Sequence, residues 1–191
     1  MVSRSVETFL AGYDLGTMAT KAEAPSVSPR VALLLQATDQ GYDHKSWHGP
    51  VLRGTLRGVT AEQAAWRPAP GRHSIWELAV HAAYWKYSIL RRLRKGERGG
   101  FPLPGSNWFP RPAELSEQAW KDDLRVLAEM HKELRQAIEG LSDTDLDSTP
   151  EGSKTRLDNL ILGGAFHDIY HAGQIQLLKR LQGIGGGTVE G

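Results

Sequence analysis

The chain has 191 residues, of which 40% are hydrophobic, and this is enough for one domain with a buried core. Its 23 basic and 22 acidic residues leave a formal net charge of +1, so no overall field favours nucleic acid or an anionic membrane. The absence of cysteine excludes disulfides, protein thiolate nucleophiles and cysteine-ligated zinc. No apolar run approaches the ~18 residues of a membrane span and no secretion signal is recognisable, so we expect a cytoplasmic protein.

Composition divides the chain into three parts. Residues 1–27 mix small and polar types and predict a loosely held N-terminal arm, while residues 184–191 predict a flexible Gly-rich tail. Residues 28–183 carry helical periodicity and form the expected domain. Within this domain, a short extra helix is expected at residues 31–41 and a second helix at residues 46–59.

The next predicted helix has a well-defined start. Ser74 and Glu77 form the S-x-x-E pattern of a capping box, so the helix should begin at Ile75 and continue to about Lys95. His81 lies on the apolar stripe of this helix, and its side chain is therefore predicted to point into the bundle.

Residues 96–115 form a long connection rich in Gly and Pro, followed by a helix at residues 116–139. The connection is long enough to return along the whole bundle, so the helices on either side of it can run parallel. The last helix, at residues 155–183, is expected to start with a second capping-box-like pattern at Thr155 and Asp158. Amphipathic helices without any strand pattern predict an all-α four-helix bundle.

Two histidines, His167 and His171, lie four residues apart in the last predicted helix and therefore project from one face of it. By spacing alone, an ordinary surface pair is the commoner explanation. The apolar stripe around both residues, and the third inward histidine at position 81, favour a metal ion instead. Three imidazoles leave one coordination position free, as in catalytic zinc sites, whereas a structural site would use four protein ligands.

Three further residues are candidates for a role in the pocket. His48 is expected near the start of a helix, where it serves as a fourth ligand, a pocket base or a structural cap. Tyr170 is typical of a packing residue, with a role as an acid as the alternative. Gln174 lies one turn beyond His171, where it either orients a water molecule on the metal or packs as a plain amide.

Asp168 gives the pattern His-Asp-x-x-His, whose acid is one methylene shorter than that of the zinc-protease pattern and which no later ligand follows. We therefore expect a carboxylate beside a ligating imidazole or on the helix surface, and not a catalytic base. His44, His73 and His131 occupy polar or boundary positions and are expected to face solvent. Trp108, in an aromatic loop, is expected to wall a substrate pocket or a dimer contact.

Two stretches of the sequence form recognisable motifs. The first reads Trp66-Arg67-Pro68…Ser74-Ile75-Trp76-Glu77…His81…Trp85, and the second reads His167-Asp168-x-x-His171-Ala172-Gly173-Gln174-Ile175. Together they resemble the DinB family of metal-binding four-helix bundles. The resemblance extends from about Leu33 to Leu181. It implies an up-down-down-up order of helices, a divalent ion (zinc or nickel) held by His81, His167 and His171, and a homodimer.

The wider superfamily includes mycothiol-dependent maleylpyruvate isomerases and bacillithiol transferases. The resemblance and the histidine pattern together favour a metal-dependent enzyme, a thiol-S-transferase or a related hydrolase, that acts on a small molecule. Because the chain has no cysteine, any thiolate would come from a low-molecular-weight thiol cosubstrate. The alternative is a non-enzymatic, stress-related metal-binding or scaffold protein. Neither nucleic acid nor a membrane is an expected partner, since no basic stripe is interleaved with aromatic residues.

Overall fold

The computed structural model describes residues 27–94 and 100–184. The predicted arm and tail therefore lie outside the described residues, apart from Val27 and Ile184. The described part of the chain forms seven helices and no strand, which confirms the all-α prediction.

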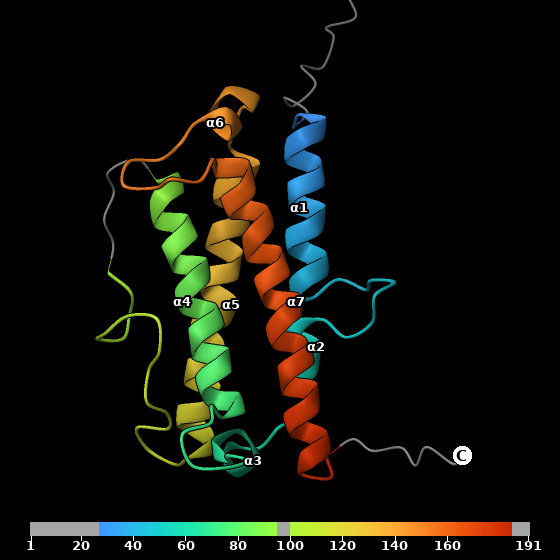
Figure 1. Ribbon diagram of the computed structural model, residues 1–191, viewed down its shortest axis with the longest axis vertical. Coiled ribbons are helices and arrows are strands. Elements are labelled where there is room, and N and C mark those ends of the chain that lie inside the picture. The colour runs from blue at the N-terminus through green and yellow to red at the C-terminus, as the bar shows by residue number, and fades with distance from the viewer. Residues whose placement is uncertain (1–26, 95–99, 185–191) are drawn as a thin grey trace, which may run out of the picture.

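Four long helices form the bundle and three short ones lie in the connections (Figure 1). The long helices are α1 (Pro29–Tyr42), α4 (Ile75–Leu93), α5 (Glu117–Glu139) and α7 (Leu157–Leu181), and the short ones are α2 (Leu52–Leu56), α3 (Ala61–Ala65) and α6 (Asp143–Asp147). Helix α7 packs against α1 and α4, and α5 packs against α4 and α1.

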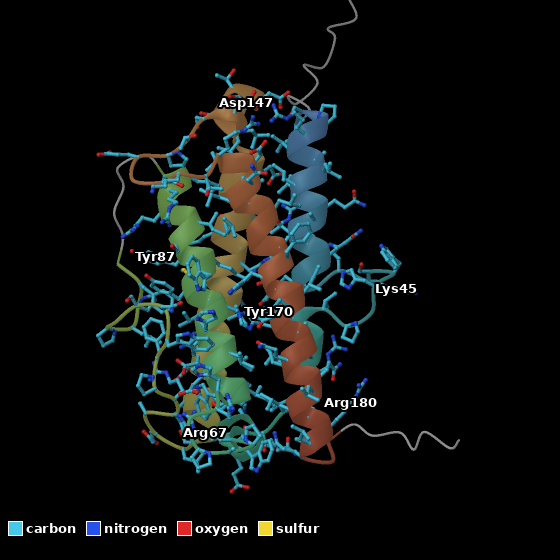
Figure 2. All side chains as sticks on the ribbon, viewed as in Figure 1. Lys45, Arg67, Tyr87, Asp147, Tyr170 and Arg180 are labelled. Carbon is cyan, nitrogen blue, oxygen red and sulfur yellow. The ribbon has the colours of Figure 1, made fainter. Side chains whose placement is uncertain are left out.

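The direction of each long helix can be followed in Figure 1. Helices α4 and α5 run from the α3 end of the bundle toward the α6 end, and α1 and α7 run the opposite way. Residues 100–116 return along the outside of the bundle, so that α5 starts at the same end as α4. Figure 2 places Arg67 at the α3 end and Asp147 at the α6 end.

The prediction for the first two helices was wrong in one respect. The helix expected to be a short extra, α1, is a full member of the bundle, whereas residues 46–59 contain only the five-residue α2. Gly49 has a φ of 106°, outside the helical range, which separates the preceding loop from α2. Leu52, Leu56 and Val59 are nevertheless buried, so their spacing correctly indicated an inward face but not a continuous helix.

The two predicted capping boxes have different outcomes. In α4 the Ser74 hydroxyl accepts a hydrogen bond from the Glu77 N–H, and the Glu77 carboxylate accepts one from the Ser74 N–H, as predicted. The box predicted at the start of α7 is absent, because Arg156 is the N-cap residue and makes no side-chain cap. Asp158 is instead bound by the guanidinium groups of Arg156 and Arg30, at 2.6 and 3.3 Å.

Two apolar clusters fill the bundle, one toward α3 and one toward α6. Between them lies a layer of buried polar side chains, one from each long helix: Asp39, Lys86, His131 and Asp168. On α4, for example, Lys86 separates the last alanines of one cluster from Ile89 of the other. This polar layer lies at the same level as the histidines discussed below, because Lys86 and Asp168 follow His81 and His167 closely in their helices.

Close helix packing explains some of the glycines. A Cβ at Gly41 of α1 would lie 2.8 Å from the Ala165 carbonyl oxygen of α7, and one at Gly164 would lie 2.6 Å from Ile89 Cδ1 of α4. Gly173 has open space around it, so no close approach requires a glycine there. Close packing therefore requires a glycine at position 164 but not at position 173.

Candidate metal centre

Three histidines from two helices meet inside the bundle. His81 is supplied by α4, while His167 and His171 lie one turn apart on α7. The Nε2 atom of His167 is 3.2 Å from Nε2 of His81 and 2.9 Å from Nε2 of His171. Nitrogens that hold one ion at 2.0–2.1 Å in a tetrahedral arrangement lie about 3.3 Å apart. The ligand atoms of the three histidines all lie within 4.8 Å of one another, so the cluster can hold a single divalent ion.

The outer nitrogens of two of these rings are held by oxygen atoms. His81 Nδ1 donates to the backbone carbonyl of Asn107 at 2.7 Å, and His171 Nδ1 donates to Oε1 of Gln174 at 2.6 Å. Because both partners are acceptors, the two rings carry their protons on Nδ1 and direct the Nε2 lone pairs into the cluster. This is the tautomer that a metal ligand needs, and an oxygen partner on the outer nitrogen is usual for ligating imidazoles.

The three Nε2 atoms cannot all be satisfied by hydrogen bonds to one another, because too few of them carry a proton. His167 Nε2 faces two Nε2 lone pairs and, in a neutral ring, has at most one proton to donate. Burial lowers the pKa of all three histidines, to about 3 for His167 and about 4 for His171, so added protons do not resolve the shortage near neutral pH. A cation bound between the three nitrogens satisfies all of them at once, and imidazole nitrogens are donors that divalent transition metals accept.

Trp108 packs against His81 and holds its ring in place. Its indole is stacked between the rings of His81 and His73, with ring centroids 3.8 and 3.6 Å away. His73 contacts the Glu77 carboxylate at 3.2 Å, which Arg67 also binds through both of its terminal nitrogens. Arg67 and Glu77 of the sequence motif thus hold His73, and through it Trp108, in place beside the histidine site. Glu77 also caps the start of α4.

Glu77 keeps its charge although it is buried. Burial alone would raise the pKa of Glu77, but hydrogen bonds from Arg67, from the Ser74 N–H and from His73 outweigh this effect and lower it. The carboxylate therefore stays ionised at neutral pH, and its charge anchors the Arg67 guanidinium.

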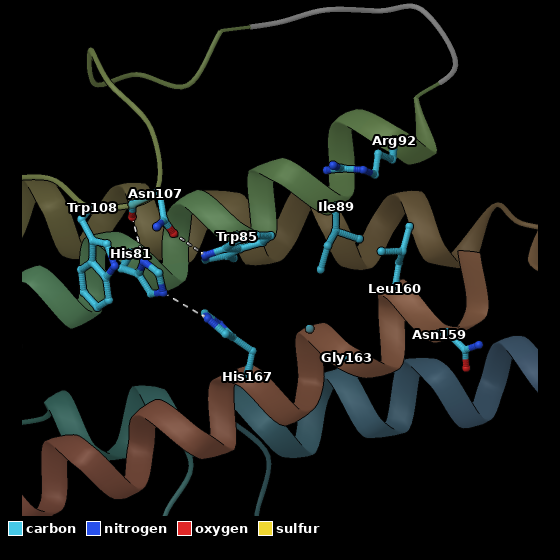
Figure 3. A pocket seen from close by; sticks show the side chains of 11 residues that line it. His81, Trp85, Ile89, Arg92, Asn107, Trp108, Asn159, Leu160, Gly163 and His167 are labelled. Carbon is cyan, nitrogen blue, oxygen red and sulfur yellow. Dashed lines mark hydrogen bonds between the residues drawn. The ribbon is translucent and has the colours of Figure 1, made fainter. Parts of the chain in front are cut away.

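A cavity of about 440 Å³ opens beside the histidines, which is large enough for a small-molecule substrate (Figure 3). His81 and His167 form one end of it together with Asn107 and Trp108. The other lining residues are Trp85, Ile89, Arg92, Asn159, Leu160, Gly163 and Gly164. Of the two roles expected for Trp108, the structure places it in a pocket wall.

The remaining candidates lie outside the cluster or at its edge. His48 is in the connection between α1 and α2 and is not part of the three-histidine group in the described chain. Tyr170 is 63% exposed, and its hydroxyl accepts a hydrogen bond from Gln174 Nε2 at 3.1 Å. Gln174 thus contacts the outer nitrogen of His171 and not the space between the three rings.

Two expectations about nearby polar residues need correction. His131 was expected to face solvent but is only 6% exposed, because its ring stacks on Tyr42 of α1 with centroids 3.9 Å apart. Asp168 is neither beside a ligating imidazole nor on the surface. It is buried and forms an ion pair with Lys86 of α4.

Sequence reasoning missed two residues that shape the site. Asn107 contributes its backbone carbonyl to His81 and its side-chain oxygen to Trp85 Nε1, at 3.0 Å, and no sequence pattern indicates a backbone acceptor. Lys86 could have been found, since it lies four residues after Ala82 and three before Ile89 on the buried stripe of α4. A charged residue at such a position usually has a buried partner.

Fold and site together define a class of protein, an all-α bundle whose two antiparallel helices α4 and α7 bring three histidines around one point. The DinB superfamily model matches residues 46–175, which is more than half of the chain and includes all three histidines. The chain therefore belongs to the DinB superfamily. Comparison with curated proteins and with solved structures finds no match. No helix in the described residues is both long and apolar enough to span a membrane.

Proposed function

We propose that the protein is a metal-dependent enzyme in which His81, His167 and His171 bind one divalent ion, zinc or nickel. The observation that carries the proposal is the convergence of three Nε2 atoms, two of them with their outer nitrogens held by oxygen acceptors. The described chain places no fourth histidine or acidic group in the cluster. The cavity is lined by two of the three histidines, His81 and His167, which favours an open, catalytic site over a closed structural one.

The ion would lower the pKa of a thiol or water that reaches it, so that a nucleophile exists near neutral pH. The protein's own part is to present three neutral imidazoles, to fix their orientation through Asn107 and Gln174, and to wall the cavity with Trp85 and Trp108. With no cysteine in the chain, a thiol-S-transferase reaction would use a low-molecular-weight thiol as cosubstrate. A related hydrolase would use water.

The metal site is tested by elemental analysis of purified, untagged protein. We expect about one divalent ion per chain, and we expect His171→Ala to lose it because the site would then keep only two ligands. His44→Ala is the matched control, since the His44 side chain is exposed and lies outside the cluster. Full metal retention in His171→Ala would remove His171 from the site.

The rival function is a non-enzymatic metal-binding or scaffold protein, whose ion only ties α4 to α7. The two proposals differ in access to the ion. With an open position, azide or a thiol should shift the visible spectrum of the cobalt-substituted protein, and a panel of glutathione, mycothiol and bacillithiol with a common electrophile should reveal turnover. An unchanged cobalt spectrum with every ligand would favour the scaffold.

We also propose that the protein is a homodimer and that neither nucleic acid nor a membrane is a partner. Support for the dimer comes from an exposed apolar stripe along α7, made up of Phe166, Tyr170, Leu177 and Leu181. Sedimentation equilibrium of the wild type and of Phe166→Glu tests it, since a charge on the stripe should shift a dimer toward monomer. Salt-dependent retention on DNA would contradict the exclusion of nucleic acid.

A further inference from the structure

The cavity beside the histidines is polar at its two ends and apolar between them. Figure 3 shows His81 and His167 at one end, Arg92 and Leu160 at the other, and Trp85 and Ile89 along the space between. Apart from the histidines, Arg92 is the one ionisable residue among those that line the cavity, and none of them is acidic. Among the described residues, the lining therefore carries one permanent positive charge and no negative one.

Part of the Arg92 guanidinium can donate further hydrogen bonds. Its Nη1 atom donates to the backbone carbonyl and to the hydroxyl of Ser88, both at 2.7 Å. Among the described residues no carboxylate pairs with it, and no other hydrogen bond engages Nε or Nη2. Nε–H and Nη2–H form the two-donor edge that binds a carboxylate in a bidentate manner.

A purely structural role explains only part of this arrangement. Arginines near a helix C-terminus are favoured by the helix dipole, and both Arg91 and Arg92 lie in the last turn of α4. Arg91, however, is exposed and does not line the histidine cavity, whereas Arg92 is partly buried in its wall. Both arginines also line a second cavity, together with Glu151. The dipole accounts for a cation at either position, but it does not explain why Arg92 also lines the histidine cavity, whose other described lining residues, apart from the histidines, are uncharged.

The spacing between the two ends sets the length of a ligand. The Arg92 guanidinium is fixed beside Ser88, which is seven residues after His81 on the same helix. A rise of 1.5 Å per residue puts the charge about 10 Å from the histidine end. The guanidinium fork matches both carboxylate and phosphate in geometry. A single guanidinium, however, balances the charge of a monoanion such as a carboxylate and only half that of a doubly charged phosphate.

We infer that the substrate of this site is an elongated, mostly apolar carboxylate, whose acid group binds Arg92 and whose reacting group lies at the three histidines. This inference rests on the proposed function for the histidine end, but the Arg92 end is tested separately. Arg92 acts here as a specificity residue that selects the charge and the length of the substrate.

The test uses two eight-carbon probes that share a metal-binding hydroxamate head. Octanohydroxamic acid ends in a methyl group, and suberic acid monohydroxamate ends in a carboxylate. We expect zinc-loaded wild-type protein to bind the carboxylate probe at least about tenfold more tightly in isothermal titration calorimetry, as for a hydrogen-bonded charge pair. Arg92→Met should abolish the preference while octanohydroxamic acid binds as before, and Arg92→Lys should keep part of it.

Arg91→Met is the matched control and should retain the full preference. Equal affinities for the two probes in the wild type, or a preference that survives in Arg92→Met, would overturn the inference. Unchanged binding of octanohydroxamic acid after zinc removal would count against the metal proposal alone, because the comparison of the two probes still reports on Arg92. If neither probe binds zinc-loaded protein, both proposals fail.

Discussion

The smallest feature on which the candidate site depends is the pair of oxygen atoms behind its histidines. The Asn107 carbonyl and Gln174 Oε1 each accept a proton from an outer ring nitrogen, and this keeps the Nε2 lone pairs of His81 and His171 directed at one point. The first acceptor is part of the backbone and cannot be removed by mutation. The second belongs to a side chain and can be tested.

Replacing Gln174 with Leu should weaken zinc binding by about 10- to 100-fold, because His171 loses the acceptor that fixes its tautomer and ring orientation. Competition with a chromogenic chelator measures this affinity directly. Tyr170→Phe is the control, since the Tyr170 hydroxyl contacts Gln174 Nε2 but not the histidine. Equal zinc affinity in Gln174→Leu and the wild type would show that the hydrogen bond does not position the ring.

At the scale of the helices, the buried polar layer fixes how the four long elements are aligned. Lys86 of α4 pairs with Asp168 of α7, and Lys86 Nζ also lies 4.9 Å above the Tyr42 ring of α1. His131 of α5 stacks on the same Tyr42 ring, and its Nε2 lies 3.9 Å from an Asp39 oxygen. A shift of one helix along its axis would bury a charge without its partner, so the layer sets the register in which His81 meets α7.

Lys86→Met should destabilise the metal-free protein by about 3–5 kcal/mol, because it leaves the Asp168 carboxylate buried without a cation. The double variant Lys86→Met/Asp168→Leu should recover most of this loss, since it removes both charges. Urea unfolding in the presence of a chelator gives the free energies. As a control, Arg94→Met breaks an exposed ion pair with Glu133 and should cost less than about 1 kcal/mol.

A loss in Lys86→Met no larger than that in Arg94→Met would mean that the Asp168 carboxylate is solvated or protonated in the folded state. Burial raises the pKa of Asp168 and the neighbouring Lys86 lowers it, so removing the lysine favours the protonated acid. The double variant contains neither group, so its stability separates the loss of the ion pair from the cost of leaving Asp168 without a cation.

For the whole molecule, sequence patterns predicted the features that depend on periodic spacing within one helix. The apolar stripe placed His81 inside the bundle, and the four-residue spacing placed His167 beside His171. What could not be predicted depends on contacts between segments far apart in the chain. His131 is buried because a ring from another helix stacks on it, and α1 joins the bundle because α7 covers it, neither of which its own neighbourhood in the sequence reveals.

The final prediction concerns how the stability of the metal-free protein depends on pH. Burial lowers the pKa of His131 and His167 to about 3 and that of His171 to about 4. The unfolded chain binds protons at these residues near the ordinary value of 6.5, whereas the folded chain does not. These histidines therefore do not lower the free energy of unfolding above pH 6.5, and they lower it progressively as the pH falls from 6.5 toward 4.

Each such histidine contributes a slope of up to about 1.4 kcal/mol per pH unit within this window. His131→Phe preserves the stack on Tyr42 and removes the titrating group, so urea unfolding between pH 6.5 and 5 should show a slope smaller by about that amount. Asp168, whose raised pKa acts with the opposite sign, is present in both proteins and cancels in the comparison. An unaltered slope in His131→Phe would mean that His131 takes up a proton in the folded protein, and that the Asp39 carboxylate 3.9 Å away is its partner.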